Sequence, residues 1–177
     1  TNTAGTTSLD VIQYFDGLGR PIQTIQKKVT PGETDLATYQ QYDSAGRPSN
    51  SWLPVSTGGS GGAFTQLSTF KTYSTNTYAD AKAYSLSIYE TSPLNRILEQ
   101  YDPGQEWHNN NKKVLIEYLS NNSTYPCRLY QTTNSRSGIE ISTTGNYADG
   151  QLSITKTSDE DGNNITYEFK NKIGQVV

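Results

Sequence analysis

Several residue types that support common protein chemistry are scarce in this sequence. Cys127 is the only cysteine, which excludes an internal disulfide and a multi-cysteine metal site. His108 is the only histidine, so it has no histidine partner for a metal, and we expect it in a loop. Cys127 has no nearby base in sequence, and we expect a small buried side chain rather than a nucleophile. We therefore predict no catalytic residue, no metal, no cofactor and no enzymatic activity.

Runs of charge and long apolar segments are also missing. The chain has 14 basic and 17 acidic residues, a net charge of -3, and no cluster of Lys and Arg, which argues against a nucleic-acid partner. No apolar run approaches the roughly 18 residues of a membrane-spanning helix. Methionine is absent even at position 1, and the opening TNTAGTTSLD has no signal-peptide pattern. We expect a piece of a longer precursor, with any export signal upstream of it.

The residues that are abundant favour β-structure. Only 32% of the 177 residues are hydrophobic, but 13 are tyrosines, which bury a large ring while the hydroxyl finds a polar partner. Threonine, serine, asparagine and glycine fill much of the remainder, a composition typical of strands joined by turns. The length suits one domain. We predict a single, mainly β domain over residues 1–177, built from antiparallel hairpins.

Two segments interrupt the expected strands. Residues 56–62 read STGGSGG, which predicts a flexible loop within one domain, or alternatively a seam between two. Residues 63–84 are the best place for one or two short helices. A stripe at three-residue steps predicts the first helix, and the segment YADAKAY predicts a second helical turn. The stripe is Phe64, Leu67, Phe70 and Tyr73.

The later strands suggest pairings with their neighbours in sequence. CRLYQTT, from residue 127, is expected beside KVLIEYL, from residue 113. Ile139 and Ile141 are expected to pair with Leu152 and Ile154 across the turn GNYADG. These pairings continue the predicted train of hairpins.

One short phrase occurs twice, as YFDGLGRP from residue 14 and as QYDSAGRP from residue 41. An Asp at the first position of a type I turn accepts bonds from backbone N–H groups ahead of it, and a Gly at the fourth adopts positive φ. Both copies therefore predict hairpin turns, with a bulge near Ile22. The turn residues are Asp16, Gly19, Asp43 and Gly46.

The arginines that follow these glycines have two possible roles. Arg20 and Arg47 can each reach back to the turn aspartate or lie across a tyrosine ring. The aromatic residue before each aspartate, Phe15 or Tyr42, is expected to pack on a neighbouring hairpin, because an isolated hairpin cannot bury its face. We interpret the phrase as the turn motif of stacked hairpins rather than as an active-site motif.

Weaker copies of the phrase appear later. YETSPLNRILEQYDPGQEW, residues 89–107, contains Glu90 and Arg96 and then Asp102 with Gly104. YEFKNKIGQVV, residues 167–177, contains Gly174, with Lys170 in the place of the aspartate and Gln175 in the place of the arginine. This last phrase is the possible start of a further repeat at residues 165–177.

The segment DEDGNN resembles a calcium loop. Asp159, Asp161 and Asn163 offer alternating oxygen donors, but Lys170 stands where a calcium loop needs glutamate, and the flanks read as strands. A hairpin turn is therefore the favoured interpretation.

The two phrases resemble the YD repeat of bacterial RHS-type proteins, whose core is Tyr-Asp, two residues and Gly-Arg. The longer phrases at 14–26, 39–55 and 89–107 are similar to an uncharacterised domain that precedes the RHS repeats in large exported proteins. TYEFKNKIGQVV resembles the start of the next repeat. The resemblance covers residues 14–107 in patches and implies a β-strand scaffold, since full-length RHS chains build a hollow β shell around a C-terminal toxin. It carries over no catalytic residue.

The resemblance thus implies a non-enzymatic structural segment of an extracellular or cell-surface protein. Its partners would be other YD repeats of the same protein, a C-terminal toxin or a surface glycan. The alternative is a surface module that binds glycans through exposed aromatic residues, with Trp52 and Trp107 as contact residues. Core packing is the competing fate of both tryptophans, and Trp52 with Leu53 is expected to anchor its strand in the core.

Overall fold

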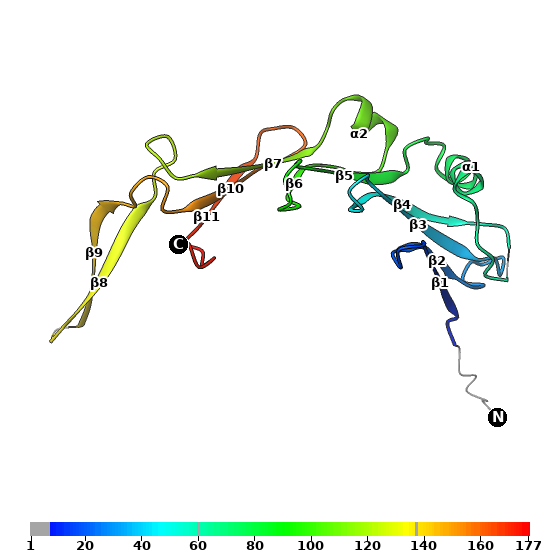
Figure 1. Cartoon of the computed structure of the whole chain (residues 1–177), viewed down its shortest axis with the longest axis horizontal. Helices are drawn as coiled ribbons and strands as arrows, with labels where there is room; N and C mark the ends of the chain where they lie inside the picture. Colours follow the sequence, from blue (N-terminus) through cyan, green and yellow to red (C-terminus); the bar gives the residue numbers. More distant parts are fainter. Residues whose placement is uncertain (1–7, 60, 137) are drawn as a thin grey trace. The chain divides into compact units, whose positions relative to one another are not determined.

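A computed structural model describes residues 8–59, 61–136 and 138–177 of the chain. The chain divides into two compact units, Thr1–Lys113 and Val114–Val177. The Gly/Ser-rich segment 56–62 lies inside the first unit, and the division falls much later, at Lys113. Strands dominate both units, which confirms the predicted mainly β fold (Figure 1).

The first unit is an antiparallel meander in which each strand pairs with the next one along the chain. The spatial order β1-β2-β3-β4-β5-β6 is therefore the sequence order. Its strands are β1 (Val11–Phe15), β2 (Pro21–Gln26), β3 (Leu36–Tyr42), β4 (Pro48–Ser56), β5 (Tyr84–Tyr89) and β6 (Ile97–Tyr101). Its helices are α1 (Leu67–Tyr78), between β4 and β5, and α2 (Gln105–Asn109), after β6.

Three hairpins of this unit, β1–β2, β3–β4 and β5–β6, each carry a shift of register beside the turn. In the first, Tyr14 pairs with Gln23 but Phe15 pairs with Pro21, so Ile22 is the extra residue of a bulge. This agrees with the bulge predicted there. Corresponding shifts precede the pairs Tyr42–Pro48 and Tyr89–Ile97. The three hairpins thus reach their turns with the same local geometry.

The core of the first unit lies between α1 and the sheet. Phe70 of α1 is fully buried, and its ring centroid lies 5.4 Å from that of Tyr39 and 6.1 Å from that of Trp52. The buried cluster consists of Ile25, Ala37, Trp52, Val55 and Phe70. The predicted apolar stripe is confirmed at Phe70 and at Tyr73, which packs against the cluster. Phe64 lies upstream of the helix, where its ring meets Tyr14 at 5.2 Å.

The Gly/Ser-rich segment is held to the sheet by the buried Asp35. One carboxylate oxygen accepts the backbone N–H of Gly62 at 2.6 Å, and the other accepts that of Lys28 at 3.1 Å. The Asp35 N–H donates to the carbonyl of Gly59 at 2.6 Å. The segment predicted as a flexible tether is therefore anchored at Gly59 and at Gly62.

The second helix predicted at YADAKAY is wrong. Asp80 in that segment accepts the backbone N–H of Lys82, and Tyr84 already begins β5. Asp80 also accepts the N–H of Gln105 with both oxygens, at 3.0 and 2.8 Å. The second short helix of the unit is instead α2, which begins at Gln105. The carboxylate of Asp80, distant in sequence, accepts the first N–H group of this helix.

The second unit contains three strands of antiparallel sheet and a separate two-stranded hairpin. The sheet has the order β7-β10-β11, and β8 pairs with β9. Its strands are β7 (Val114–Ser120), β8 (Arg128–Ser135), β9 (Gly138–Asn146), β10 (Ser153–Ser158) and β11 (Ile165–Lys170). Both predicted pairings are therefore wrong, since β8 does not pair with β7, and β9 does not pair with β10.

A buried asparagine accounts for this topology. Asn121 follows β7, and its side chain accepts the N–H of Leu152 at 2.7 Å and donates to the carbonyl of Ala148 at 2.9 Å. These bonds fix the start of β10 beside the end of β7, so β8 and β9 are left to pair with each other. Among the described residues, no helix is long and apolar enough to cross a membrane.

We predict that Phe70→Ala destabilises the first unit by about 3–5 kcal/mol, because it removes a fully buried ring from the centre of the core. Both tryptophans lie in this unit, so tryptophan fluorescence during urea unfolding reports on it. Phe15→Ala serves as the control, since Phe15 is 54% exposed. Equal losses in the two variants would contradict the assigned core.

Candidate functional site

The first repeated phrase forms a tight turn between β1 and β2. One carboxylate oxygen of Asp16 accepts the backbone N–H groups of Leu18 and Arg20, both at 2.9 Å. The other carboxylate oxygen accepts a hydrogen bond from Nε of Arg20 at 2.7 Å and lies 2.6 Å from Nη2 of the same side chain. The Gly19 N–H donates to the Asp16 carbonyl at 3.0 Å, and Gly19 has a φ of +76°. A single carboxylate thus holds both the turn backbone and the arginine side chain.

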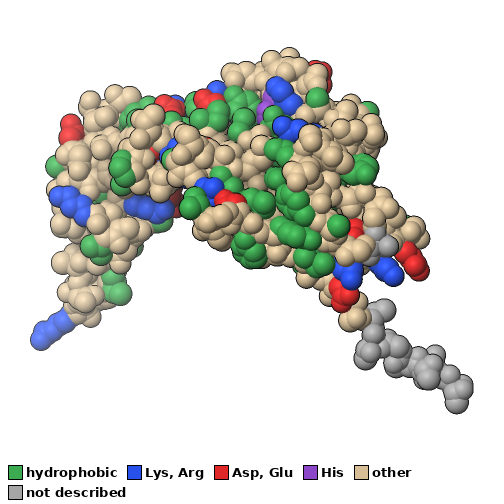
Figure 2. Space-filling view, turned by 45° about the vertical axis from the view of Figure 1, so that its right-hand side comes forward, with side chains coloured by type: hydrophobic (Ala, Val, Ile, Leu, Met, Phe, Trp, Pro, Cys, Tyr) green, Lys and Arg blue, Asp and Glu red, His purple; other side chains and the backbone are tan. Residues whose placement is uncertain are grey.

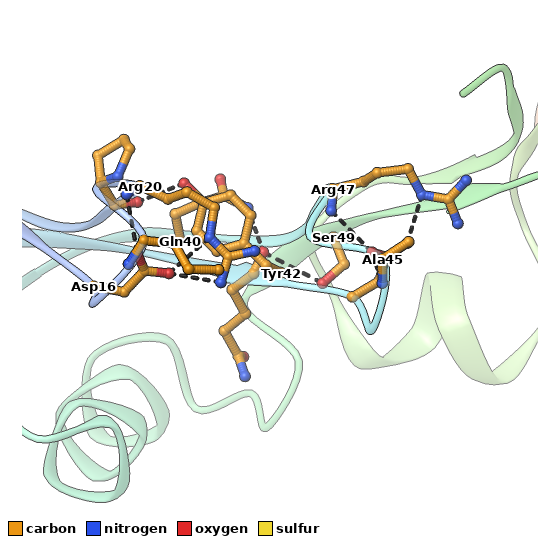
Figure 3. A network of polar contacts seen from close by, with 11 residues as sticks. Asp16, Arg20, Gln40, Tyr42, Ala45, Arg47 and Ser49 are labelled. Atoms are coloured by element: carbon orange, nitrogen blue, oxygen red, sulfur yellow. Dashed lines mark hydrogen bonds and ion pairs between the residues drawn. The ribbon is translucent and has the colours of Figure 1, made fainter. Parts of the chain in front are cut away.

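The second phrase repeats this geometry between β3 and β4 (Figure 3). Asp43 accepts the N–H groups of Ala45 and Arg47 at 2.9 Å and Nε of Arg47 at 2.7 Å. Gly46 donates to the Asp43 carbonyl at 3.0 Å and has a φ of +82°. The structure thus places all six predicted turn residues in the two hairpin turns.

A third turn of related design joins β5 to β6. Glu90 takes the place of the aspartate, and it accepts Nε of Arg96 at 2.9 Å and Nη2 at 2.6 Å. The loop is longer, and Asn95 supplies the positive φ, +56°, in place of a glycine. The second echo, at Asp102 and Gly104, is not such a turn, because it leads into α2.

The turns are joined to one another by their arginines and tyrosines. The Arg20 guanidinium lies 4.4 Å from the ring centroid of Tyr42, whose hydroxyl donates to the Pro21 carbonyl at 2.7 Å (Figure 3). Arg47 lies 4.6 Å from the Tyr89 ring, whose hydroxyl donates to the Pro48 carbonyl at 2.9 Å. We call this set of contacts the Arg–Tyr ladder, formed by Arg20, Tyr42, Arg47 and Tyr89.

The ladder resolves the two roles left open for the arginines, because each arginine performs both. It binds the carboxylate of its own turn and stacks on the tyrosine of the next hairpin. Arg47 Nη1 also donates to the Glu90 carbonyl at 2.9 Å. The glycine of the second turn leaves room for the first arginine, since a Cβ on Gly46 would lie 2.7 Å from Nη1 of Arg20.

The pKa values of the turn carboxyl groups are shifted in the direction expected for bonded anions. The backbone N–H of Arg20 is the largest cause that lowers the pKa of Asp16, and that of Arg47 does the same for Asp43. Hydrogen bonds from the Arg96 side chain lower the pKa of Glu90 from 4.5 to about 2. All three groups are therefore anions at neutral pH, as the ladder requires.

The last turn of the chain, in the second unit, has the same backbone geometry without charge. Asn171 accepts the N–H groups of Ile173 at 3.1 Å and Gln175 at 3.0 Å. Its side-chain amide donates to that of Gln175 at 3.0 Å. The comparison of phrases that put Lys170 in the place of the turn aspartate is therefore wrong by one residue, since Asn171 takes that place. Lys170 takes the place of Phe15 instead, in a bridge with Val176.

The other candidate residues do not come together in a site. Trp52 is buried in the core, so it cannot offer a ring to a glycan, whereas Trp107 on α2 is 40% exposed. His108 lies in α2 rather than in a loop, and its ring stacks on that of Tyr101 at 5.1 Å. Cys127 is partly exposed rather than buried, because it leads into β8, whose residues are almost all exposed.

The calcium-like segment is a hairpin turn between β10 and β11. Asp159 accepts the backbone N–H of Asn163 at 2.9 Å and is also bonded by the side-chain amide of Asn164. Gly162 donates to the Asp159 carbonyl at 3.0 Å and has a φ of +73°. Within the described ranges, no three His, Cys, Asp or Glu side chains are grouped as a metal site would require.

A depression of about 460 Å³ lies beside the ladder on the first unit. Gln13, Thr24, Thr38, Tyr42 and Ser51 are among the residues that line it, and all of its lining residues are uncharged. It contains no pair of carboxyl groups of the kind that general acid–base catalysis uses.

The fold and the turns define a class of protein, an antiparallel β-meander whose hairpins are joined by a repeated carboxylate–arginine–tyrosine contact. The chain belongs to the family described as "Domain of unknown function (DUF6443)", which matches residues 1–120. That match includes all three turns connected by the ladder and excludes the last turn at Asn171–Gln175. No curated protein and no solved structure matches the chain.

We predict that Gly46→Ala destabilises the first unit more than Gly19→Ala does. Both substitutions strain a left-handed φ, at a cost of about 1–3 kcal/mol. Only the alanine at 46 also displaces the Arg20 guanidinium from Tyr42, a further cost of about 0.5–1 kcal/mol. Gly19 has nothing within 4 Å of its would-be Cβ and is the matched control. Denaturant unfolding measures both, and equal losses would exclude contact across the hairpins.

We also predict that Glu90→Gln lowers stability at neutral pH and that its effect fades in acid. Because the folded pKa of Glu90 is depressed, its contribution is fully present above the ordinary value of 4.5. It is lost as the pH falls toward about 2, where the folded-state carboxylate takes up its proton. Urea unfolding of both proteins across this window measures the difference. Glu33→Gln is the control, since Glu33 is exposed, and a difference that stays constant with pH would contradict the assignment.

Proposed function

We propose that this chain is a non-enzymatic scaffold segment of a large exported bacterial protein of the RHS/YD-repeat kind. The observation that carries the proposal is the Arg–Tyr ladder. It repeats the same contact between successive hairpins, which is how a sheet can be extended hairpin by hairpin. The resemblance of residues 14–21 and 39–48 to YD repeats supports the same role.

In this role the chain forms part of the wall of a β shell. Its partners are the other YD repeats of the full-length protein and a C-terminal toxin enclosed by the shell, and its location is extracellular or at the cell surface. The last turn supports continuation of the pattern, because Asn171 and Gln175 keep the turn geometry up to Val176. The alternative role in binding glycans loses one of its two aromatic residues, since Trp52 is buried.

The full-length protein provides the test. We expect cryo-electron microscopy to find the strands of residues 1–177 continuous with further hairpins in one wall. A structure in which this segment forms a separate domain, with no strand shared with the rest, would overturn the proposal.

We predict that Arg20→Ala combined with Arg47→Ala makes the full-length protein more sensitive to protease. The double variant removes both stacking contacts of the ladder, worth about 0.5–1 kcal/mol each at exposed sites. Limited proteolysis of the shell and of its C-terminal segment measures the effect. Arg136→Ala, outside the three turns, is the control and is expected to resemble the natural protein. Equal sensitivity of all three proteins would argue against a wall held by the ladder.

A further inference from the structure

The first hairpin contains a ladder position that the described contacts leave unoccupied. Phe15, Tyr42 and Tyr89 are equivalent, because each ends the first strand of its hairpin at the same shift of register. Tyr42 and Tyr89 each lie under the arginine of the preceding hairpin. Phe15 has no preceding hairpin within residues 8–59, 61–136 and 138–177, and it is 54% exposed.

The strand that carries Phe15 is an edge strand with an apolar row. β1 pairs with β2 and, among the described strands, with no other. Val11, Gln13 and Phe15 alternate on one side of this strand, and Leu9 lies just before it. The three apolar residues of this row, Leu9, Val11 and Phe15, are 57%, 52% and 54% exposed. Hydrophobic side chains are visible at the surface on the right-hand part of Figure 2, which carries β1 to β4. An exposed apolar edge strand is a template for pairing with a further strand.

We propose that the free edge of β1 binds a further β-hairpin of the same turn type by antiparallel strand addition, with the arginine of that hairpin stacked on Phe15. The inference deepens the proposed scaffold role and rests on it. Backbone hydrogen bonds to β1 supply the pairing, and the guanidinium over an aromatic face sets the register. Within the chain, β3 pairs with β2 and receives Arg20 in this same way.

The chemistry of the occupant favours a separate hairpin over a second copy of this chain. In a second copy, Arg20 and Arg47 already lie over Tyr42 and Tyr89 of their own chain. Arg96 belongs to a longer turn of another type, with Asn95 in the place of the glycine. The last turn of a second copy offers Gln175, whose amide is uncharged and is bonded to Asn171. The partner is therefore a separate hairpin with an acidic residue at the start of its turn and Gly-Arg at the end.

A tandem chain tests the proposal. A copy of residues 8–35 is joined directly to Leu9 of the natural sequence, so that Leu9 takes the place that Leu36 has after β2. The amides of β1 that point away from β2 are followed by hydrogen exchange. We expect them to exchange at least about tenfold more slowly in the tandem chain than in the natural one.

Substitutions in the tandem chain isolate the stacking contact. Arg20→Ala in the added copy is expected to speed exchange of these amides by about two- to fivefold, the size of one exposed cation–π contact. Phe15→Ala in the original hairpin should have the same effect, and the combined variant should show no further change. Phe15→Ala in the natural chain, which has no added arginine, should leave exchange of these amides unaltered.

Three results would overturn the proposal. In the first, the amides of the added hairpin exchange like those of an unfolded chain while β2 to β6 stay protected. The sequence of the added hairpin is the same as that of the first hairpin of the natural chain, so its turn is able to form. The two substitutions could act additively. The natural chain alone could protect these amides in a concentration-dependent way, which would make a second copy the occupant.

If the full-length protein forms the expected wall but the tandem chain shows no protection, this inference alone fails. Protection in the tandem chain, without such a wall, would refute only the scaffold role.

Discussion

The bond between a turn carboxylate and the arginine four residues later is the interaction on which the arrangement of hairpins depends. In solution an arginine side chain samples many rotamers, and Asp16 and Asp43 restrict Arg20 and Arg47 to one position each. An ion pair that solvent still reaches in part contributes little by itself to the free energy of unfolding. Its importance is geometric, since a fixed guanidinium can lie over the ring of the next hairpin and a mobile one cannot. Stability comes instead from the buried cluster around Phe70.

The ladder and the core set the register of the sheet from opposite sides. Trp52 and Ile25 face α1 and bury the apolar side of β2 to β4. Arg20 and Tyr42 join the same strands at their turn ends, where the bulge would otherwise loosen the pairing. The tyrosine hydroxyl adds a bond to the Pro21 carbonyl, which is available because the strand begins there. A slip of one residue would break all of these contacts together.

A feature of the structure could be predicted from the sequence where the residues that form it are close together along the chain. The turns at Asp16 and Asp43 involve five consecutive residues, so the turn chemistry alone identified them. The turn at Glu90 was seen only as a weak copy, because its loop is longer and Asn95, rather than glycine, takes the left-handed conformation. The pairing of β7 with β10 could not be predicted, since it depends on Asn121 bonding to residues far along the chain. The start of α2 depends in the same way on Asp80.

The uncharged last turn separates the two tasks that the aspartate and arginine perform. Asn171 accepts the same two backbone N–H groups as Asp16 does, and Gly174 takes the same left-handed conformation as Gly19. The turn backbone therefore needs only a side-chain oxygen at its first position and has no need of a negative charge. Gln175 also closes the side-chain contact without an ion pair. The neutral pair Asn171–Gln175 has no cation to place over an aromatic ring. The positive charge of Arg20 and Arg47 is therefore explained by the stacking of each arginine on a tyrosine of the next hairpin, and not by the needs of its own turn.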